Sequence, residues 1–118
     1  MASGRLFHAY AFMQPSDDEP IRSVITETAE AAVVAWYVKP GQRIAAHLHP
    51  AGQDTWTILS GQGDYQTDAS GSSLAITAGD VVVAPKGCVH GVSNNGKEPL
   101  TFISVVTPAD AGFEPVRN

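Results

Sequence analysis

The sequence predicts an all-β domain. Glycine and proline supply 11 and 8 of its 118 residues and recur between short runs rich in Val, Ile and Thr, which is typical of strands separated by turns. No segment keeps apolar residues at the helical period over three turns without a Gly or Pro, so we expect at most a short helix at either end. Nine such runs indicate a sandwich or a barrel.

The nine expected strands follow one another at short intervals. In chain order they are residues 21–28, 31–39, 43–49, 55–59, 64–68, 74–77, 81–84, 89–93 and 100–106. Most of the breaks between them carry turn-forming residues. These are Pro40-Gly41, Ser60-Gly61, Ala69-Ser70-Gly71, Ala78-Gly79-Asp80, Pro85-Lys86-Gly87 and Asn94-Asn95-Gly96.

The chain is expected to form one domain over residues 1–118, because it has no internal repeat, low-complexity tract or shift in composition. We expect residues 1–20 to form an N-terminal arm, residues 21–107 the barrel, and residues 108–118 an extended or irregular tail that Phe113 pins to the barrel. The acidic run in residues 17–20 is read as a solvated loop.

Charge and hydropathy exclude several classes of partner. Seven Lys and Arg stand against 12 Asp and Glu, without a basic cluster, so nucleic acid is not an expected partner. The longest apolar run, residues 31–38, is less than half the length of a membrane-spanning helix, so no membrane partner is expected either. No signal peptide is recognisable, and the single cysteine, Cys88, favours a reducing, cytoplasmic location.

Three of the four histidines lie near turns that flank expected strands. His47 and His49 are two residues apart on one strand, so their side chains leave the same face and can bind one ion. His90 lies near the start of another expected strand and could supply a third ligand. Imidazole ligands suit one divalent transition metal ion: Fe, Mn, Ni, Zn or Cu. Taken alone, the histidine pair fits an exposed or hydrogen-bonded polar pair equally well.

The spacing of residues around these histidines resembles the two motifs of the cupin superfamily. The first motif is matched by Gly41, His47, His49, Asp54 and Gly61, and the second by Gly79, Pro85, Gly87, His90 and Asn94. The resemblance is to small, single-domain cupins with a conserved barrel. It implies a double-stranded β-helix, a jelly-roll-like barrel with little or no helix, and a metal near one mouth of the barrel.

Asp54 departs from the family pattern, which has a glutamate as the fourth ligand. It shares strand parity with Trp56 and Ile58, so the carboxylate faces inward if those two side chains do. Three roles stay open for Asp54: direct metal ligand, holder of a metal-bound water, or catalytic base just outside the ligand sphere. Without Asp54 as a ligand, the ion would have three histidines and three open positions.

Other notable side chains are given structural roles. Asn94 is expected to close a turn, Cys88 to be a small packed side chain, and Arg43 and Lys86 to be solvated rather than to bind an anion. Core packing is expected for the aromatic residues of the strands, with only one of the adjacent pair Trp36 and Tyr37 facing inward. The others are Trp56, Tyr65 and Phe102.

The resemblance predicts a metal-binding cupin. We favour a mononuclear enzyme that acts on a small oxygen-bearing organic molecule by dioxygenase chemistry or by isomerase or lyase chemistry. The alternative is a binding or sensing module that uses the same pocket without catalysis. A metal-free acid–base enzyme is less favoured, because it gives no reason for the paired histidines. A homodimer is expected, formed through an apolar N-terminal strand region at residues 6–13.

Overall fold

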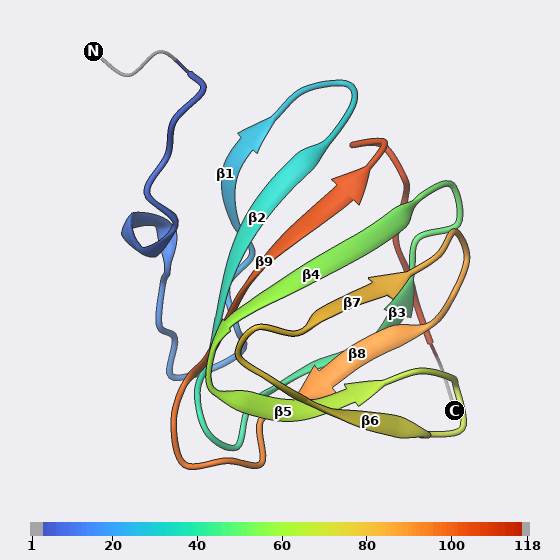
Figure 1. Ribbon diagram of the computed structural model, residues 1–118. Helices are drawn as coiled ribbons and strands as arrows, with labels where there is room; N and C mark the ends of the chain where they lie inside the picture. Colours follow the sequence, from blue (N-terminus) through green and yellow to red (C-terminus); the bar gives the residue numbers. More distant parts are fainter. Residues whose placement is uncertain (1–3, 117–118) are drawn as a thin grey trace.

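The computed structural model describes residues 4–116 and contains two antiparallel five-stranded sheets (Figure 1). One sheet has the order β1 (Ser23–Glu27), β2 (Ala32–Val38), β9 (Leu100–Thr107), β4 (Gln53–Ser60), β7 (Val81–Ala84). The other has the order β10 (Glu114–Pro115), β3 (Arg43–Leu48), β8 (His90–Ser93), β5 (Gln62–Gln66), β6 (Ser73–Thr77). The prediction of an all-β chain is confirmed.

All nine expected strands form, each within two residues of its predicted ends. The tenth strand, β10, lies in the tail that was expected to be irregular, and it pairs with His47 and Leu48 of β3. Two residues, one of them a proline, carry no periodic pattern, so this strand depends on a long-range contact.

The N-terminal arm does not form the expected strand at residues 6–13. It contains instead the single turn of 3₁₀ helix η1 (Ala9–Phe12), the one helical segment in the described part of the chain. Figure 1 shows the arm running alongside β1 and β2. Within residues 4–116, no helix has the length and apolarity to cross a membrane.

The core fills the space between the sheets, because alternate side chains of each strand point inward. On β4, Asp54, Trp56 and Ile58 are buried while Gln53 and Thr57 are exposed, which confirms the predicted parity. The Trp56 ring stacks on Phe102 with centroids 4.2 Å apart. The main core cluster consists of Val38, Trp56, Ile58, Tyr65, Ile76, Val92, Leu100 and Phe102. Of the adjacent aromatic pair on β2, Trp36 packs against this cluster.

Asn94 is fully buried and closes the turn after β8, as expected. Its Nδ2 donates to the carbonyls of Val38 and Glu98, both at 2.9 Å, and its Oδ1 accepts from the Gly96 amide at 2.9 Å. Every polar atom of the amide is therefore paired within the protein, as a buried group requires.

Gly61, between β4 and β5, offers a test of this packing. Its φ is +81°, and a Cβ there would lie 2.2 Å from the Pro99 carbonyl oxygen. We expect Gly61→Ala to lower the free energy of unfolding by about 3 kcal/mol or more, because backbone must move. Gly71 is the control, since its φ is +96° but nothing lies within 4 Å of the added Cβ. Gly71→Ala should cost only about 1 kcal/mol. Urea unfolding measures both, and equal losses would contradict the steric argument.

Candidate metal centre

Four side chains that are far apart in the sequence converge at one end of the barrel: His47, His49, Asp54 and His90. One ligand atom from each lies within 4.8 Å of the others. His90 is fully buried, and Asp54 and His47 are nearly so. The structure thus brings together the whole set that the sequence analysis selected, and this cluster could bind a metal ion.

The strand register produces this convergence. His47 of β3 is paired directly with His90 of β8, so the two imidazoles lie side by side with ring centroids 4.4 Å apart. His49 follows one strand period later and projects from the same face as His47. Asp54 comes from β4 in the opposite sheet, so the cluster joins the two sheets.

Hydrogen bonds orient each imidazole through its Nδ1 atom. His47 Nδ1 lies 2.8 Å from the Ala45 carbonyl oxygen and His49 Nδ1 lies 2.7 Å from the Gly112 carbonyl oxygen. A carbonyl can only accept, so both Nδ1 atoms carry the proton. His47 Nε2 is then left with its lone pair, whereas protonated His49 Nε2 donates to Asp54 Oδ2 at 3.3 Å and must lose that proton before it can bind a metal. His90 Nδ1 lies 3.4 Å from the Tyr65 hydroxyl. Such contacts behind a histidine are typical of metal ligands.

Asp54 is held between the two sheets by its own contacts. Its Oδ1 accepts a hydrogen bond from the Ser104 hydroxyl at 2.5 Å, and its Oδ2 lies 3.3 Å from His49 Nε2 and 3.4 Å from His90 Nε2. Ser104 is a residue that the sequence analysis missed. The available signal was a polar side chain at a position of β9 that shares parity with the apolar Phe102 and Val106.

The site favours neutral imidazole at His90 and an ionised carboxylate at Asp54. Burial, together with the nearby His47, lowers the pKa of His90 to about 3. Burial also lowers the pKa of His47, whereas the hydrogen bond to Asp54 raises the pKa of His49. Burial opposes ionisation of Asp54, but His49, Ser104 and His90 outweigh it and hold the pKa of that carboxyl below its usual value. Neutral imidazole and carboxylate are the forms that bind metals.

One atom of the cluster makes no hydrogen bond within residues 4–116, although Asp54 Oδ2 lies 3.4 Å from it. His90 Nε2 is completely buried and makes no hydrogen bond, an arrangement that ordinarily costs about 1–3 kcal/mol. Two ligand atoms in a tetrahedral arrangement around an ion, each about 2.1 Å away, lie about 3.4 Å apart. The separations of Asp54 Oδ2 from His49 and His90 are close to this value. The donor set therefore fits a divalent transition metal ion.

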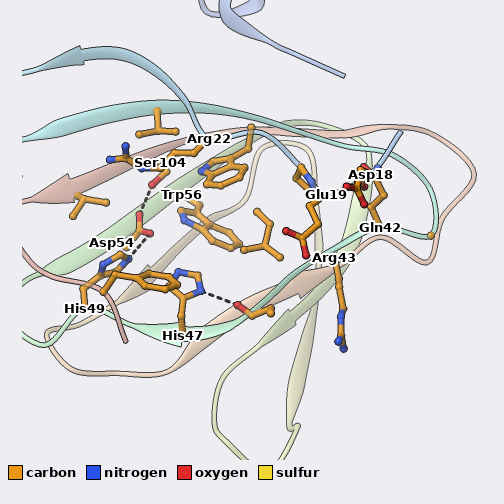
Figure 2. A pocket seen from close by; sticks show the side chains of 18 residues that line it. Asp18, Glu19, Arg22, Gln42, Arg43, His47, His49, Asp54, Trp56 and Ser104 are labelled. Atoms are coloured by element: carbon orange, nitrogen blue, oxygen red, sulfur yellow. Dashed lines mark hydrogen bonds and ion pairs between the residues drawn. The ribbon is translucent and has the colours of Figure 1, made fainter. Parts of the chain in front are cut away.

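A cavity of about 560 Å³ opens beside the cluster (Figure 2). Part of its wall is apolar and comes from Val34, Trp36, Trp56 and Val106. His47, His49 and Asp54 lie at one end of this cavity, so a small molecule inside it would be next to a bound ion.

The acidic loop before β1 contributes to the cavity. Asp18 and Glu19 are exposed, as predicted for a solvated loop, and they also line the cavity. The cause is Gln42, whose Nε2 donates to the carbonyls of Ser16 at 2.7 Å and Asp18 at 2.6 Å and so holds the loop over the barrel. Arg22, which the sequence analysis did not single out, lines the cavity as well.

The sequence and structure comparisons agree with this geometry. Residues 34–106 match the family model for the cupin domain. The chain is a member of the cupin family. A solved double-stranded β-helix protein from Klebsiella pneumoniae subsp. pneumoniae MGH 78578, described as uncharacterized, is similar over 97% of this cupin and 98% of that chain, with 46% identity and a TM-score of 0.93. The predicted double-stranded β-helix is thereby confirmed.

More distant relatives show how widely this barrel is used. Germin-like protein 5-1 from Oryza sativa subsp. japonica is 28% identical over 109 residues, 88% of this cupin and 46% of that protein. The oxalate-binding protein of Thermotoga maritima is 31% identical over 67 residues, 57% of this cupin and 54% of that protein. The cupin thus spans about half the length of these curated relatives.

Three expectations about single residues have different outcomes. Phe113 is 64% exposed, yet its ring centroid lies 5.1 Å from that of His47, so the tail borders the site. Arg43 and Lys86 are both exposed, as expected, and Arg43 also lines the cavity. Cys88 is exposed, so the prediction of a packed side chain is wrong. It lies in the turn before β8, where its amide donates to the Pro85 carbonyl, and the inward alternation begins only at His90.

The Ser104 hydrogen bond generates a pH-dependent prediction for the metal-free protein. Ser104→Ala should lower the free energy of unfolding by about 2 kcal/mol at neutral pH, because a buried carboxylate loses a donor. The folded-state pKa of Asp54 is depressed, so its charge contributes stability above the unfolded pKa of about 3.8, and this contribution is lost as the pH falls through the folded value. The difference between wild type and variant should therefore shrink in acid.

Urea unfolding across the acidic range measures this difference. Ser60→Ala is the control, because it removes a hydroxyl that bonds to Thr101 and not to a carboxylate. A loss for Ser104→Ala that stays constant with pH would contradict a role for Ser104 in holding the Asp54 charge.

Proposed function

We propose that this cupin is a metal-dependent enzyme that acts on a small oxygen-bearing organic molecule in the cavity. In this proposal His47, His49, Asp54 and His90 hold one divalent transition metal ion: Fe, Mn, Ni, Zn or Cu. The observation that carries it is the buried His90 Nε2, which makes no hydrogen bond within residues 4–116 and shares a cluster with two oriented imidazoles and a carboxylate beside a cavity. When bound, the ion would supply Lewis-acid or dioxygen-activating chemistry, which serves dioxygenase, isomerase and lyase reactions alike.

The residues of the chain have separate tasks in this proposal. The three histidines present Nε2 because their Nδ1 atoms are engaged by Ala45, Gly112 and Tyr65. Asp54 completes the ligand set through Oδ2, or takes up a proton from the substrate at that atom while Ser104 retains Oδ1. Val34 and Trp36 restrict water around the substrate, which strengthens electrostatic interactions within the site.

A non-catalytic binding or sensing module is the second candidate. The name of the Thermotoga maritima relative describes binding alone, and that protein is 31% identical over 67 residues. Assays of metal-dependent turnover and oxygen uptake on enols, diketones, thiols and uronates separate the two functions. Ligand binding detected by thermal shift, with no turnover of any compound, would favour the module.

The first test is elemental analysis by mass spectrometry of untagged protein purified without a chelator. We expect a near-stoichiometric transition metal in the wild type and none in the matched His47→Ala/His49→Ala variant. Circular dichroism should show that the variant keeps the β fold, because the main core cluster contains neither residue. Absence of metal from the wild type, even after reconstitution, would refute the metalloenzyme.

The same measurement distinguishes the roles of Asp54. Asp54→Asn keeps the size of the side chain and removes its charge. Because Oδ2 lies 3.3 Å and 3.4 Å from two of the proposed ligand atoms, we expect the variant to bind metal at least about tenfold more weakly. Unchanged affinity would place Asp54 outside the ligand sphere and leave it the role of a base.

We also propose that the cupin acts as a single domain and forms a homodimer through its N-terminal arm. Support comes from the exposure of apolar side chains there, with Leu6 82% and Tyr10 51% exposed. The mass in solution, from light scattering, measures the oligomeric state. A cytoplasmic location remains a prediction from the single cysteine.

A further inference from the structure

A basic side chain, Arg22, lies at the end of the cavity that holds the metal-binding cluster. We propose that Arg22 forms a carboxylate-binding subsite, so that the ligand of the cavity is a small monocarboxylic acid. This inference rests on the proposed function, in which the cavity is the substrate site. It adds the chemical class of the substrate and the residue that selects that class.

The backbone directs Arg22 into the cavity. The next residue, Ser23, begins β1 and is paired with Ala35 of β2. Val34 and Trp36, on either side of Ala35, face the cavity, so Ala35 points to the opposite face of the sheet. Paired residues of neighbouring strands share a face, so Ser23 also points away from the cavity. Ser23 is 5% exposed and its hydroxyl accepts a hydrogen bond from Gln14 Nε2 at 2.9 Å, which fixes the strand start. Side chains alternate along extended chain, so Arg22 projects from the face of the sheet that borders the cavity, where its side chain lines the cavity and is exposed to solvent.

The guanidinium group lies close to the metal-binding cluster. Figure 2 shows the Arg22 side chain at the same end of the cavity as Asp54 and Ser104. A ligand that touches the cluster can therefore contact Arg22 at the same time.

Arg22 is available for such a ligand. The structure gives it no hydrogen bond or ion pair with any side chain of residues 4–116. Asp54 is already engaged by Ser104 and lies beside His49 and His90. The carboxylates of Asp18 and Glu19 lie toward the opposite end of the cavity in Figure 2. A guanidinium presents a planar fork of donors that matches the two oxygens of a carboxylate.

The rest of the cavity argues for one carboxylate and an apolar body. Val34, Trp36 and Val106 form an apolar wall beyond Arg22. Glu19 at the far end would repel a second carboxylate, because like charges in a partly enclosed site destabilise each other. The volume of about 560 Å³ accommodates a small organic acid.

The experiment is calorimetric titration of the zinc-loaded protein with phenylacetate and hexanoate, and with their neutral amides. We expect both carboxylates to bind wild type more tightly than the amides. Arg22→Gln should weaken carboxylate binding about tenfold or more and leave amide binding unchanged, because it removes charge-assisted hydrogen bonds. Arg22→Lys should recover part of the loss. Lys97→Gln is the matched control, since Lys97 is exposed and is not among the residues that line the cavity, and it should change affinity less than about twofold.

Two further ligands test the class of anion. Adipate should bind wild type more weakly than hexanoate, and Glu19→Gln should reduce that difference. Inorganic phosphate should bind more weakly than the monocarboxylates. Tighter binding of phosphate than of carboxylates, lost in Arg22→Gln, would overturn the assignment to carboxylic acids.

Failure of this inference can be distinguished from failure of the proposed function. Zinc content is measured first for every protein. Zinc-loaded wild type that does not bind either carboxylate, or binds them as Arg22→Gln does, would refute the Arg22 subsite while the metal site stands. Wild type that takes up no zinc would refute the metalloenzyme, and the same titrations on the metal-free protein would still decide the role of Arg22.

Discussion

The site depends on one buried carboxylate that connects the two sheets. Asp54 enters from β4, and its oxygens contact Ser104 of β9 on one side and lie beside His49 and His90 from the facing sheet on the other. An ionised carboxylate is stable in this apolar barrel only with such partners. The contacts that stabilise its charge also place its second oxygen among the imidazoles, so the requirements of folding and of metal binding coincide.

The imidazoles are oriented by groups outside the cluster. The His49 ring depends on the Gly112 carbonyl, and Gly112 belongs to the tail that returns to pair with β3. The His90 ring depends on Tyr65, a member of the main core cluster. The tail and the core thus each control one potential ligand. A change in either would affect the site without touching the cluster itself.

Part of the cavity is built by the segment that precedes β1. Gln42 holds the acidic loop in place through two backbone carbonyls, and that loop leads directly into Arg22 and Ser23. Arg22, Asp18 and Glu19 of this segment therefore border a cavity whose barrel wall is partly apolar. The cupin barrel supplies the metal-binding geometry, while the N-terminal segment supplies most of the charge that a ligand would meet.

Local periodicity in the sequence determined the nine strands, the shared face of His47 and His49, and the inward direction of Asp54. These features follow from the period of two along a strand and from turn residues, which act over a few positions. Only the tertiary structure decided that Ser104 pairs with Asp54, that β10 forms, that Cys88 is exposed, and that Arg22 enters the cavity. Each of these depends on register or chain return between segments distant in sequence, for which no local pattern exists.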